Sequence, residues 1–272
     1  MVPTVLNLNT GAPFQPFARS PQVTISYKIN KLKFTGAALY QFQYSSTGVS
    51  GTSSNYIKYA NMPELFLGIE NKNTSWIIGA GAEMKKIVPR TSTTVGGSTL
   101  KVNESLLSYG GNIYAQYSNS LFCIKTKTSY GQNLSDLSML GGYGVSSLDT
   151  ISGKQNYTSF NMISAWINAT YGKKWQVGLF AGYTQNLGTD KALYETTSGV
   201  SIYGNGVSGN QMIGCMYKIS PQLSYNPNNF RIGLEYDYTI AEWGDVTPID
   251  GVVRNAKNVL NHRILGFIAY YF

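Results

Sequence analysis

The 272-residue chain carries a formal net charge of +8, yet only 12% of its residues are charged and 13% are aromatic. Soluble proteins typically contain about 25% charged residues, and a membrane helix needs roughly 18 consecutive apolar residues, which this sequence lacks. Two cysteines form no disulfide framework, although a Cys123–Cys215 pairing stays open, and one histidine gives no His-rich metal set. We expect no cofactor, no metal and no nucleic acid partner.

The first distinctive segment is Thr10 to Gln22, which reads TGAPFQPFARSPQ. Its three prolines and two phenylalanines are incompatible with a regular central strand. Two interpretations stay open: the segment folds inside the sheet that follows it as a constriction, or it forms an ordered outer loop or rim cap. In either case residues 1–22 are a unit separate from residues 23–272.

From residue 22 onward, apolar and polar residues alternate in stretches of about ten residues, the period of a β-strand. The alternation predicts eleven strands, at 22–29, 32–44, 63–70, 76–87, 106–117, 122–130, 160–171, 175–184, 211–225, 230–239 and 263–272.

The connections between these strands alternate between short and long. The short turns are Asn30-Lys31, 71–75, 118–120, 172–174 and 226–229, and the long connections are 45–56, 88–104, 131–157, 188–210 and 244–262. Short turns at one end and long loops at the other are typical of a transmembrane β-barrel. We therefore predict an all-β, antiparallel transmembrane barrel with about 11–12 strands in residues 23–272.

Each strand has one apolar and one polar face. In the stretch 230–239, Phe230, Ile232 and Leu234 share one face, while Arg231 and Glu235 share the other. A soluble sandwich or lipocalin-like barrel would bury the apolar face, and that alternative stays open. We favour the inverted arrangement because small residues such as Gly36 and Ala38 cover lipid adequately but fill a core poorly.

Aromatic residues at the strand ends support a membrane-spanning sheet, since such barrels have aromatic girdles at both interfaces. The predicted interface aromatics are Phe34, Trp76, Tyr117, Tyr171, Trp175, Phe230, Tyr270 and Phe272. The final stretch RILGFIAYYF is similar to the C-terminal strand signal of bacterial outer-membrane proteins, with its glycine displaced by one position.

A barrel wider than eight strands leaves water inside, so the polar face is expected to line a pore. The basic candidates on it are Lys28, Lys33, Lys85, Lys125, Lys127, Lys218 and Arg231, and the acidic candidates are Glu70, Glu83, Glu235 and Asp237. This excess of positive charge predicts a preference for small anions, carboxylates in particular. The competing interpretation is that carboxylates balance the lysines or that the lysines point into loops.

The sequence contains no G-x-S-x-G, H-E-x-x-H, P-loop or Rossmann motif in its structural context. The Gly-Gly-Tyr-Gly stretch at 141–144 is expected to be flexible loop, and His262 is placed at the entrance of the last strand. We therefore expect no catalytic residue and no enzymatic activity.

Four stretches resemble the DcaP-like porins of Bacteroidetes outer membranes: 6–22, 129–146, 166–189 and the closing NHRILGFIAYYF. The resemblance runs over essentially the whole chain. It implies a trimeric, 16-stranded porin that takes up dicarboxylates and similar small anions through a pore with arginines at its narrowest point. Arg19, within the matching FARSPQ stretch, is the candidate for such an arginine.

The family members carry a signal peptide and several strands upstream of this region, so the resemblance makes the chain look N-terminally truncated. An eleven-stranded count places the two ends of the sheet on opposite sides of the membrane, whereas such barrels have an even count. Either residues Val2 to Asn9 supply a twelfth strand, or an odd number of strands is missing.

The sequence thus predicts an outer-membrane porin, with lipid, lipopolysaccharide, two further copies of itself and small anionic solutes as partners. A structural or binding barrel, whose long extracellular loops contact a partner or ligand, is the alternative. An outer-membrane hydrolase would depend on His262.

Overall fold

The computed structural model describes all residues, 1–272. Eleven long antiparallel strands follow one another in chain order, as predicted. They are β1 (Gln22–Ile29), β2 (Leu32–Leu39), β5 (Glu64–Lys72), β6 (Trp76–Ile87), β9 (Leu106–Ser118), β10 (Phe122–Gln132), β12 (Gln155–Gly172), β13 (Trp175–Thr189), β18 (Gln211–Tyr225), β19 (Phe230–Val246) and β20 (Val253–Tyr270). No helix in the protein is long and apolar enough to cross a membrane.

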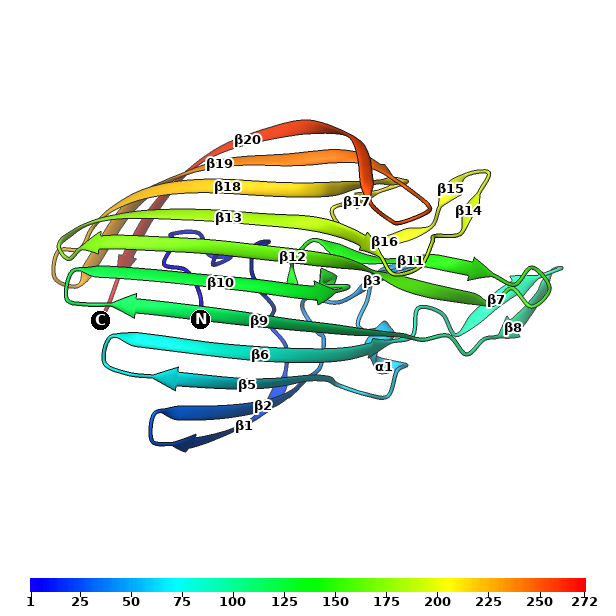
Figure 1. Ribbon diagram of the computed structural model, residues 1–272, viewed down its shortest axis with the longest axis horizontal. Helices are drawn as coiled ribbons and strands as arrows, with labels where there is room; N and C mark the ends of the chain where they lie inside the picture. Colours follow the sequence, from blue (N-terminus) through cyan, green and yellow to red (C-terminus); the bar gives the residue numbers. More distant parts are fainter.

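The strands form one curved sheet that is not closed, with β1 and β20 as its free edges (Figure 1). Every short turn lies at one end of the sheet and every long connection at the other. In the β1–β2 turn, Asn30 adopts a left-handed conformation with φ of 51°. Asparagine tolerates this geometry, which favours tight hairpins.

The long connections contain short strands and helical turns that strand alternation does not predict. Their short elements are β3 (Thr47–Gly48), β4 (Gly51–Thr52), α1 (Asn55–Lys58), β7 (Ser92–Val95), β8 (Ser98–Lys101), the 3₁₀ helix η1 (Ser135–Leu137), β11 (Gly141–Leu148), β14 (Glu195–Thr196), β15 (Gly199–Val200), β16 (Ile202–Asn205) and β17 (Val207–Ser208). The expectation of a flexible loop at 141–144 is wrong. These residues begin β11, which is buried and pairs with β12 and β16.

Several strands are longer than predicted at the long-connection end, whereas β2 is shorter and stops at Leu39 rather than at residue 44. The strand β20 begins at Val253 rather than 263, and β19 continues to Val246 rather than 239. His262 therefore lies within β20 and not at its entrance. The strands extend further because backbone pairing continues through polar residues, as in the register of Glu242 with Asn258.

The two faces of the sheet differ in polarity, and the apolar face is the exposed one. We call this the outer face, where Leu67 is 69% and Ile264 is 73% exposed. On the opposite, inner face, Glu235 is 1% and Lys218 is 7% exposed. A soluble sandwich would show the reverse, with the apolar face buried.

Residues 1–21 form no strand, so the proposal that Val2 to Asn9 supply a twelfth strand is wrong. This N-terminal segment lies against the inner face, behind the strands in the view of Figure 1. Its Phe14 packs with Trp166 of β12 and Phe180 of β13 in a small apolar cluster. A larger apolar core, which includes Leu137, Met139 and Ile202, lies under the long connections.

Candidate functional site

Aspartate Asp237 is the centre of a buried ionic cluster on the inner face of β18 to β20. The Nζ atom of Lys218 lies 2.9 Å from Asp237 Oδ2, and Arg263 pairs with the same oxygen. Ser220 Oγ donates a hydrogen bond of 2.6 Å to Asp237 Oδ1. Two of the predicted pore residues, Lys218 and Asp237, are therefore paired, and because Asp237 also pairs with Arg263 the cluster keeps one net positive charge.

Lysine Lys85 on β6 pairs with Asp136 of η1, and both side chains are buried. Gln41 Nε2 donates a hydrogen bond of 2.9 Å to the other oxygen of Asp136. Strand alternation does not predict this pair, because Asp136 lies in a long connection whose path does not follow from it. Glu64, 5% exposed at the start of β5, is also absent from the predicted site.

Six of the eight predicted basic residues make no ion pair: Arg19, Lys28, Lys33, Lys125, Lys127 and Arg231. Lys28 and Lys33 face each other in the β1–β2 register and are exposed. Lys33 is also in register with Glu70, whose carboxylate accepts a hydrogen bond of 2.9 Å from Tyr114. Glu83 lies on β6, two residues before Lys85, on the same face.

The guanidinium of Arg231 lies 6.0 Å from the ring centroid of Phe267. Its Nε and Nη2 atoms are buried without a hydrogen-bond partner. Arg19 is exposed and lies 5.9 Å above the ring of Phe17. The predicted basic residues are thus distributed along the sheet rather than gathered into one cluster.

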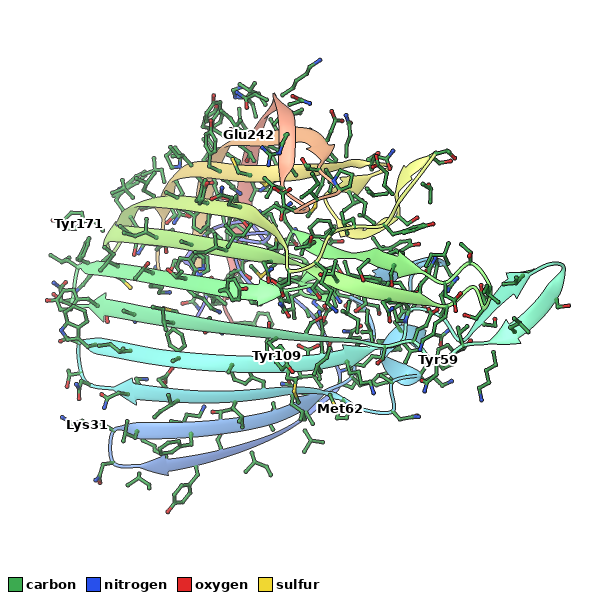
Figure 2. The ribbon with its side chains drawn as sticks, turned by 45° about the vertical axis from the view of Figure 1, so that its right-hand side comes forward. Lys31, Tyr59, Met62, Tyr109, Tyr171 and Glu242 are labelled. Carbon is green, nitrogen blue, oxygen red and sulfur yellow. The ribbon has the colours of Figure 1, made fainter.

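The predicted interface aromatics lie at the short-turn end of the sheet. Figure 2 shows Tyr171 and Lys31 at this end and Tyr59 at the opposite one. Neighbouring strands bring the rings into contact, with centroid distances of 4.8 Å for Trp76–Tyr117, 4.5 Å for Trp175–Tyr225 and 4.9 Å for Phe230–Tyr270. Phe34 is exposed on β2, and Phe272 follows the end of β20.

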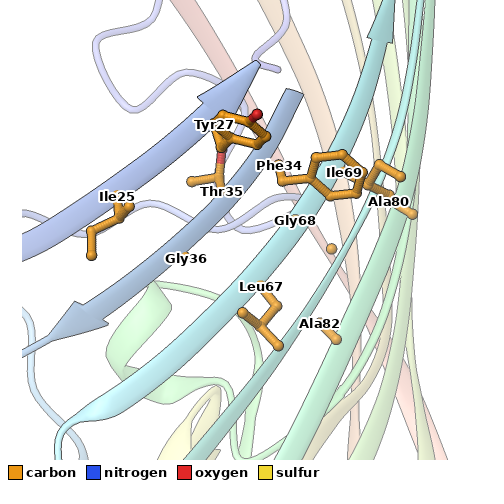
Figure 3. Close-up of a pocket in the computed structure, with 11 residues that line it drawn as sticks. Ile25, Tyr27, Phe34, Thr35, Gly36, Leu67, Gly68, Ile69, Ala80 and Ala82 are labelled. Carbon is orange, nitrogen blue, oxygen red and sulfur yellow. The ribbon is translucent and has the colours of Figure 1, made fainter. Parts of the chain in front are cut away.

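Small residues leave shallow hollows in the outer face over β1, β2, β5 and β6. One hollow of ≈ 600 Å³ lies between Ile25, Phe34 and Leu67, above the glycines and alanines of β5 and β6 (Figure 3). The hollow is apolar and contains no charged side chain. Its apolar lining suits an aliphatic chain better than a polar substrate.

At the long-connection end, Arg90 and Glu104 form a clamp across the β7–β8 hairpin. Arg90 donates hydrogen bonds of 3.0 Å and 2.6 Å to the two Glu104 oxygens, and Tyr157 donates one of 2.5 Å. Burial opposes ionisation of Glu104, but the hydrogen bonds from Arg90 and Tyr157 outweigh it and lower the pKa of this carboxyl. The clamp holds the hairpin to β12.

The N-terminal segment is held by inner-face side chains of β10, β12, β18 and β19. Asn168, Gln222 and Glu235 bond to its backbone near Thr4 and Leu6. The sequence pattern places these three side chains on the polar face, but it does not identify what they contact. Their partners are main-chain groups of residues 1–21, and only the folded structure shows that this segment lies against the inner face.

Among solved structures, the chain is similar to the outer-membrane expressed OmpT of Vibrio cholerae. The TM-score is 0.50 at 11% identity, over 92% of this chain and 64% of that one. The fold is the antiparallel sheet of an outer-membrane β-barrel, which here is not closed between β1 and β20. The chain spans 64% of the length of OmpT.

Two further solved structures are similar at lower TM-scores. The NanC porin gives a TM-score of 0.35 at 9% identity over 92% of each chain. The P. putida toluene transporter TodX gives 0.38 at 9% identity, over 92% of this chain and 80% of that one. No protein-family model matches the chain, and no curated protein matches it in sequence.

Proposed function

We propose that this protein is a bacterial outer-membrane porin, a passive diffusion channel for small polar solutes. The observation that carries the proposal is the inverted polarity of the sheet, with charged and amide side chains inside and aliphatic side chains exposed. In lipid every backbone polar group needs a partner, which the nine inner strands gain by pairing with both neighbours, while β1 and β20 each keep one unpaired edge. The exposed aliphatic residues then contact the lipid chains, and the aromatic rings lie at the level of the headgroups.

We propose further that the channel prefers anions. Lys85 and Lys218 are paired with buried aspartates, which supports the competing interpretation for these two residues. Lys28, Lys33 and Lys127 make no ion pair, although Glu70 lies in register with Lys33, so they contribute positive charge to the inner face. Unpaired basic groups in a pore attract anions and raise their local concentration. The proposed solutes are small carboxylates. They include the dicarboxylates that the family resemblance implies.

A planar lipid bilayer measurement tests both parts of the proposal. The purified protein is expected to give stepwise increases in conductance. In a salt gradient, the sign of the reversal potential is expected to show that anions are more permeable than cations. A cation-selective reversal potential would contradict the anion preference while leaving the channel intact. The absence of current from a folded, inserted protein would contradict the channel itself.

The second candidate is a structural or binding barrel without channel activity. One observation favours it: residues 1–21 occupy part of the interior, with Phe14 and Gln15 each 1% exposed. In this case the folded long connections would contact a partner at the cell surface, and no current would flow. Neither candidate involves a chemical step, so we propose no enzymatic activity.

The proposed setting includes outer-membrane lipid and lipopolysaccharide around the outer face and a homotrimer, as the resemblance implies. Chemical cross-linking of the protein in membranes tests the oligomeric state. A ladder that ends at three copies is expected, and a single-copy band at all cross-linker concentrations would contradict the trimer.

A further inference from the structure

Four inner-face side chains converge on residues Thr4 to Leu6 of the N-terminal segment. Asn168 Oδ1 accepts a hydrogen bond of 2.7 Å from the Thr4 amide, and Gln222 Nε2 donates one of 2.6 Å to the Thr4 carbonyl. Glu235 Oε2 accepts one of 2.7 Å from the Leu6 amide. These three bonds all go to the main chain, so they do not depend on which side chains the segment carries.

The fourth side chain, Lys125, contacts both a side chain and the main chain of the segment. Lys125 Nζ donates a hydrogen bond of 2.8 Å to the Thr4 hydroxyl and one of 3.3 Å to the Val2 carbonyl. The four groups come from β10, β12, β18 and β19, which are neighbours only within the folded sheet. Together they offer both donors and acceptors, which is the chemistry that a peptide backbone needs.

Apolar surface lies beside these polar groups and receives the side chains of the segment. Val5 packs against the cluster of Phe14, Trp166 and Phe180. Leu6 is 3% exposed and lies over Gly233, where an added Cβ atom would come within 2.7 Å of Leu6 Cδ1. The surface therefore accommodates an aliphatic side chain because β19 carries a glycine at that position.

The segment is held by side chains and not by the strand ladder. Residues 1–21 form no strand, so no backbone bond between neighbouring strands is lost when Thr4 to Leu6 leave the inner face. What their departure exposes is a set of amide, carboxylate and ammonium groups that have lost their partners. Unpaired groups of this kind favour any ligand that restores their hydrogen bonds.

We propose that Asn168, Gln222 and Glu235 form a binding subsite for the main chain of short extended peptides, and that Thr4 to Leu6 occupy it as a tethered competitor. The inference rests on the proposed channel function and adds a second solute class, short peptides, to the small carboxylates proposed above. A peptide with an aliphatic residue displaces the segment, because its amides make the same bonds and its side chain takes the place of Leu6. Binding at the inner face then precedes passage through the pore.

The test uses single-channel recording with a synthetic heptapeptide of the sequence Val2 to Leu8, VPTVLNL. Its control is the same peptide N-methylated at the residues equivalent to Thr4 and Leu6, which keeps the side chains but removes the two donors. We expect the unmodified peptide to block current at a concentration at least tenfold lower than the methylated one. Equal potency of the two peptides, or no block by either, would overturn the proposal.

Variants of the full chain locate the block at the subsite. The double substitution Asn168→Ala with Gln222→Ala is expected to weaken block by the heptapeptide at least tenfold. The matched control is Asn112→Ala, an inner-face asparagine of β9 that makes no hydrogen bond to the segment, and it should leave block unchanged. Equal weakening by both variants would contradict a subsite at Asn168 and Gln222.

A variant that lacks residues 2–9 separates the inference from the function. If it inserts and conducts, the heptapeptide is expected to block it at a lower concentration than it blocks the full chain, because the tethered competitor is gone. If it conducts but the heptapeptide does not block it, the subsite is refuted and the channel stands. If neither chain conducts although both are folded and inserted, the channel itself is refuted.

Discussion

The sheet has two regions with the same alternation but different surroundings. In β1 every residue is exposed, including those on the inner face such as Lys28. In β12 and β18 the inner positions are buried, as for Asn168 and Lys218, because the N-terminal segment and the long connections lie over them. We call these the uncovered region (β1 and β2) and the covered region (β12, β13, β18 and β19).

The contrast shows that alternation determines which side chains face inward but not whether they are buried. In the covered region, the charges of Lys218 and Asp237 are paired and packed, so they contribute mainly to stability, whereas Arg231 on the same face makes no ion pair. In the uncovered region, the charges are free and solvated, so they contribute mainly to the electric field of the interior. Substitutions of similar chemistry should therefore have different effects in the two regions.

The largest difference is expected for the ionic cluster of the covered region. Asp237→Ala leaves Lys218 buried without its carboxylate, which costs about 3–5 kcal/mol for a broken buried pair. Denaturant unfolding in detergent measures the loss. The control is Lys33→Ala in the uncovered region, where no ion pair exists, and it should unfold like the unsubstituted protein. Equal effects would remove the distinction between the regions.

The clamp at the long-connection end gives a smaller, pH-dependent effect. Glu104→Gln should cost about 1.5–3 kcal/mol, the range for hydrogen bonds to charged groups. Because the folded protein lowers the pKa of Glu104 below its usual 4.5, the contribution is present above that value. It is lost as the pH falls through the folded pKa. Proteolysis of residues 91–102 at decreasing pH reports it, and a pH-independent rate would contradict the clamp.

Two glycines provide a matched pair on opposite faces. At Gly182, an added Cβ atom would lie 2.6 Å from the ring of Phe14, so Gly182→Ala should displace the segment and cost about 1–3 kcal/mol by overpacking. At Gly36 on the outer face, the nearest atom would be Leu67 Cδ2 at 3.7 Å, so Gly36→Ala should be tolerated. Equal melting temperatures for the two variants would indicate that the segment does not rest on β13.

The smallest effect on stability is expected for the free lysines of the uncovered region. Lys28→Glu with Lys33→Glu should leave the unfolding transition unchanged, because both side chains are exposed. The same change should move the reversal potential toward cations, since it reverses two unpaired charges. A measured potential equal to that of the unsubstituted channel would exclude these lysines from the conduction path.

The sequence was sufficient for the eleven strands and their faces, since residues such as Leu67 and Glu235 follow a strict period of two. It was not sufficient for the long connections. Residues 141–144 look like a flexible glycine-rich loop, yet Gly142 and Gly204 allow β11 and β16 to approach so closely that a Cβ atom on either would meet backbone. Tertiary contacts, and not local pattern, create that strand.

For the candidate site, the sequence predicts only which side chains lie on the inner face of the sheet. The pairs Lys218–Asp237 and Lys85–Asp136 depend on strand register and on the path of a long connection, neither of which alternation reveals. The hydrogen bonds to Thr4 link residues more than 160 positions apart in the case of Asn168. No local signal in the sequence connects such distant groups.

The apolar cluster under the N-terminal segment has an optical consequence. Of the four tryptophans, Trp166 is 2% exposed against Phe14 and Phe180, whereas Trp76 and Trp175 are 49% and 62% exposed on the outer face. When the segment detaches, the indole of Trp166 passes from an apolar to an aqueous environment. Trp166 is thus an intrinsic fluorophore whose emission should shift to longer wavelength if the segment detaches, whereas Trp76 and Trp175 are already exposed on the outer face and should keep their emission.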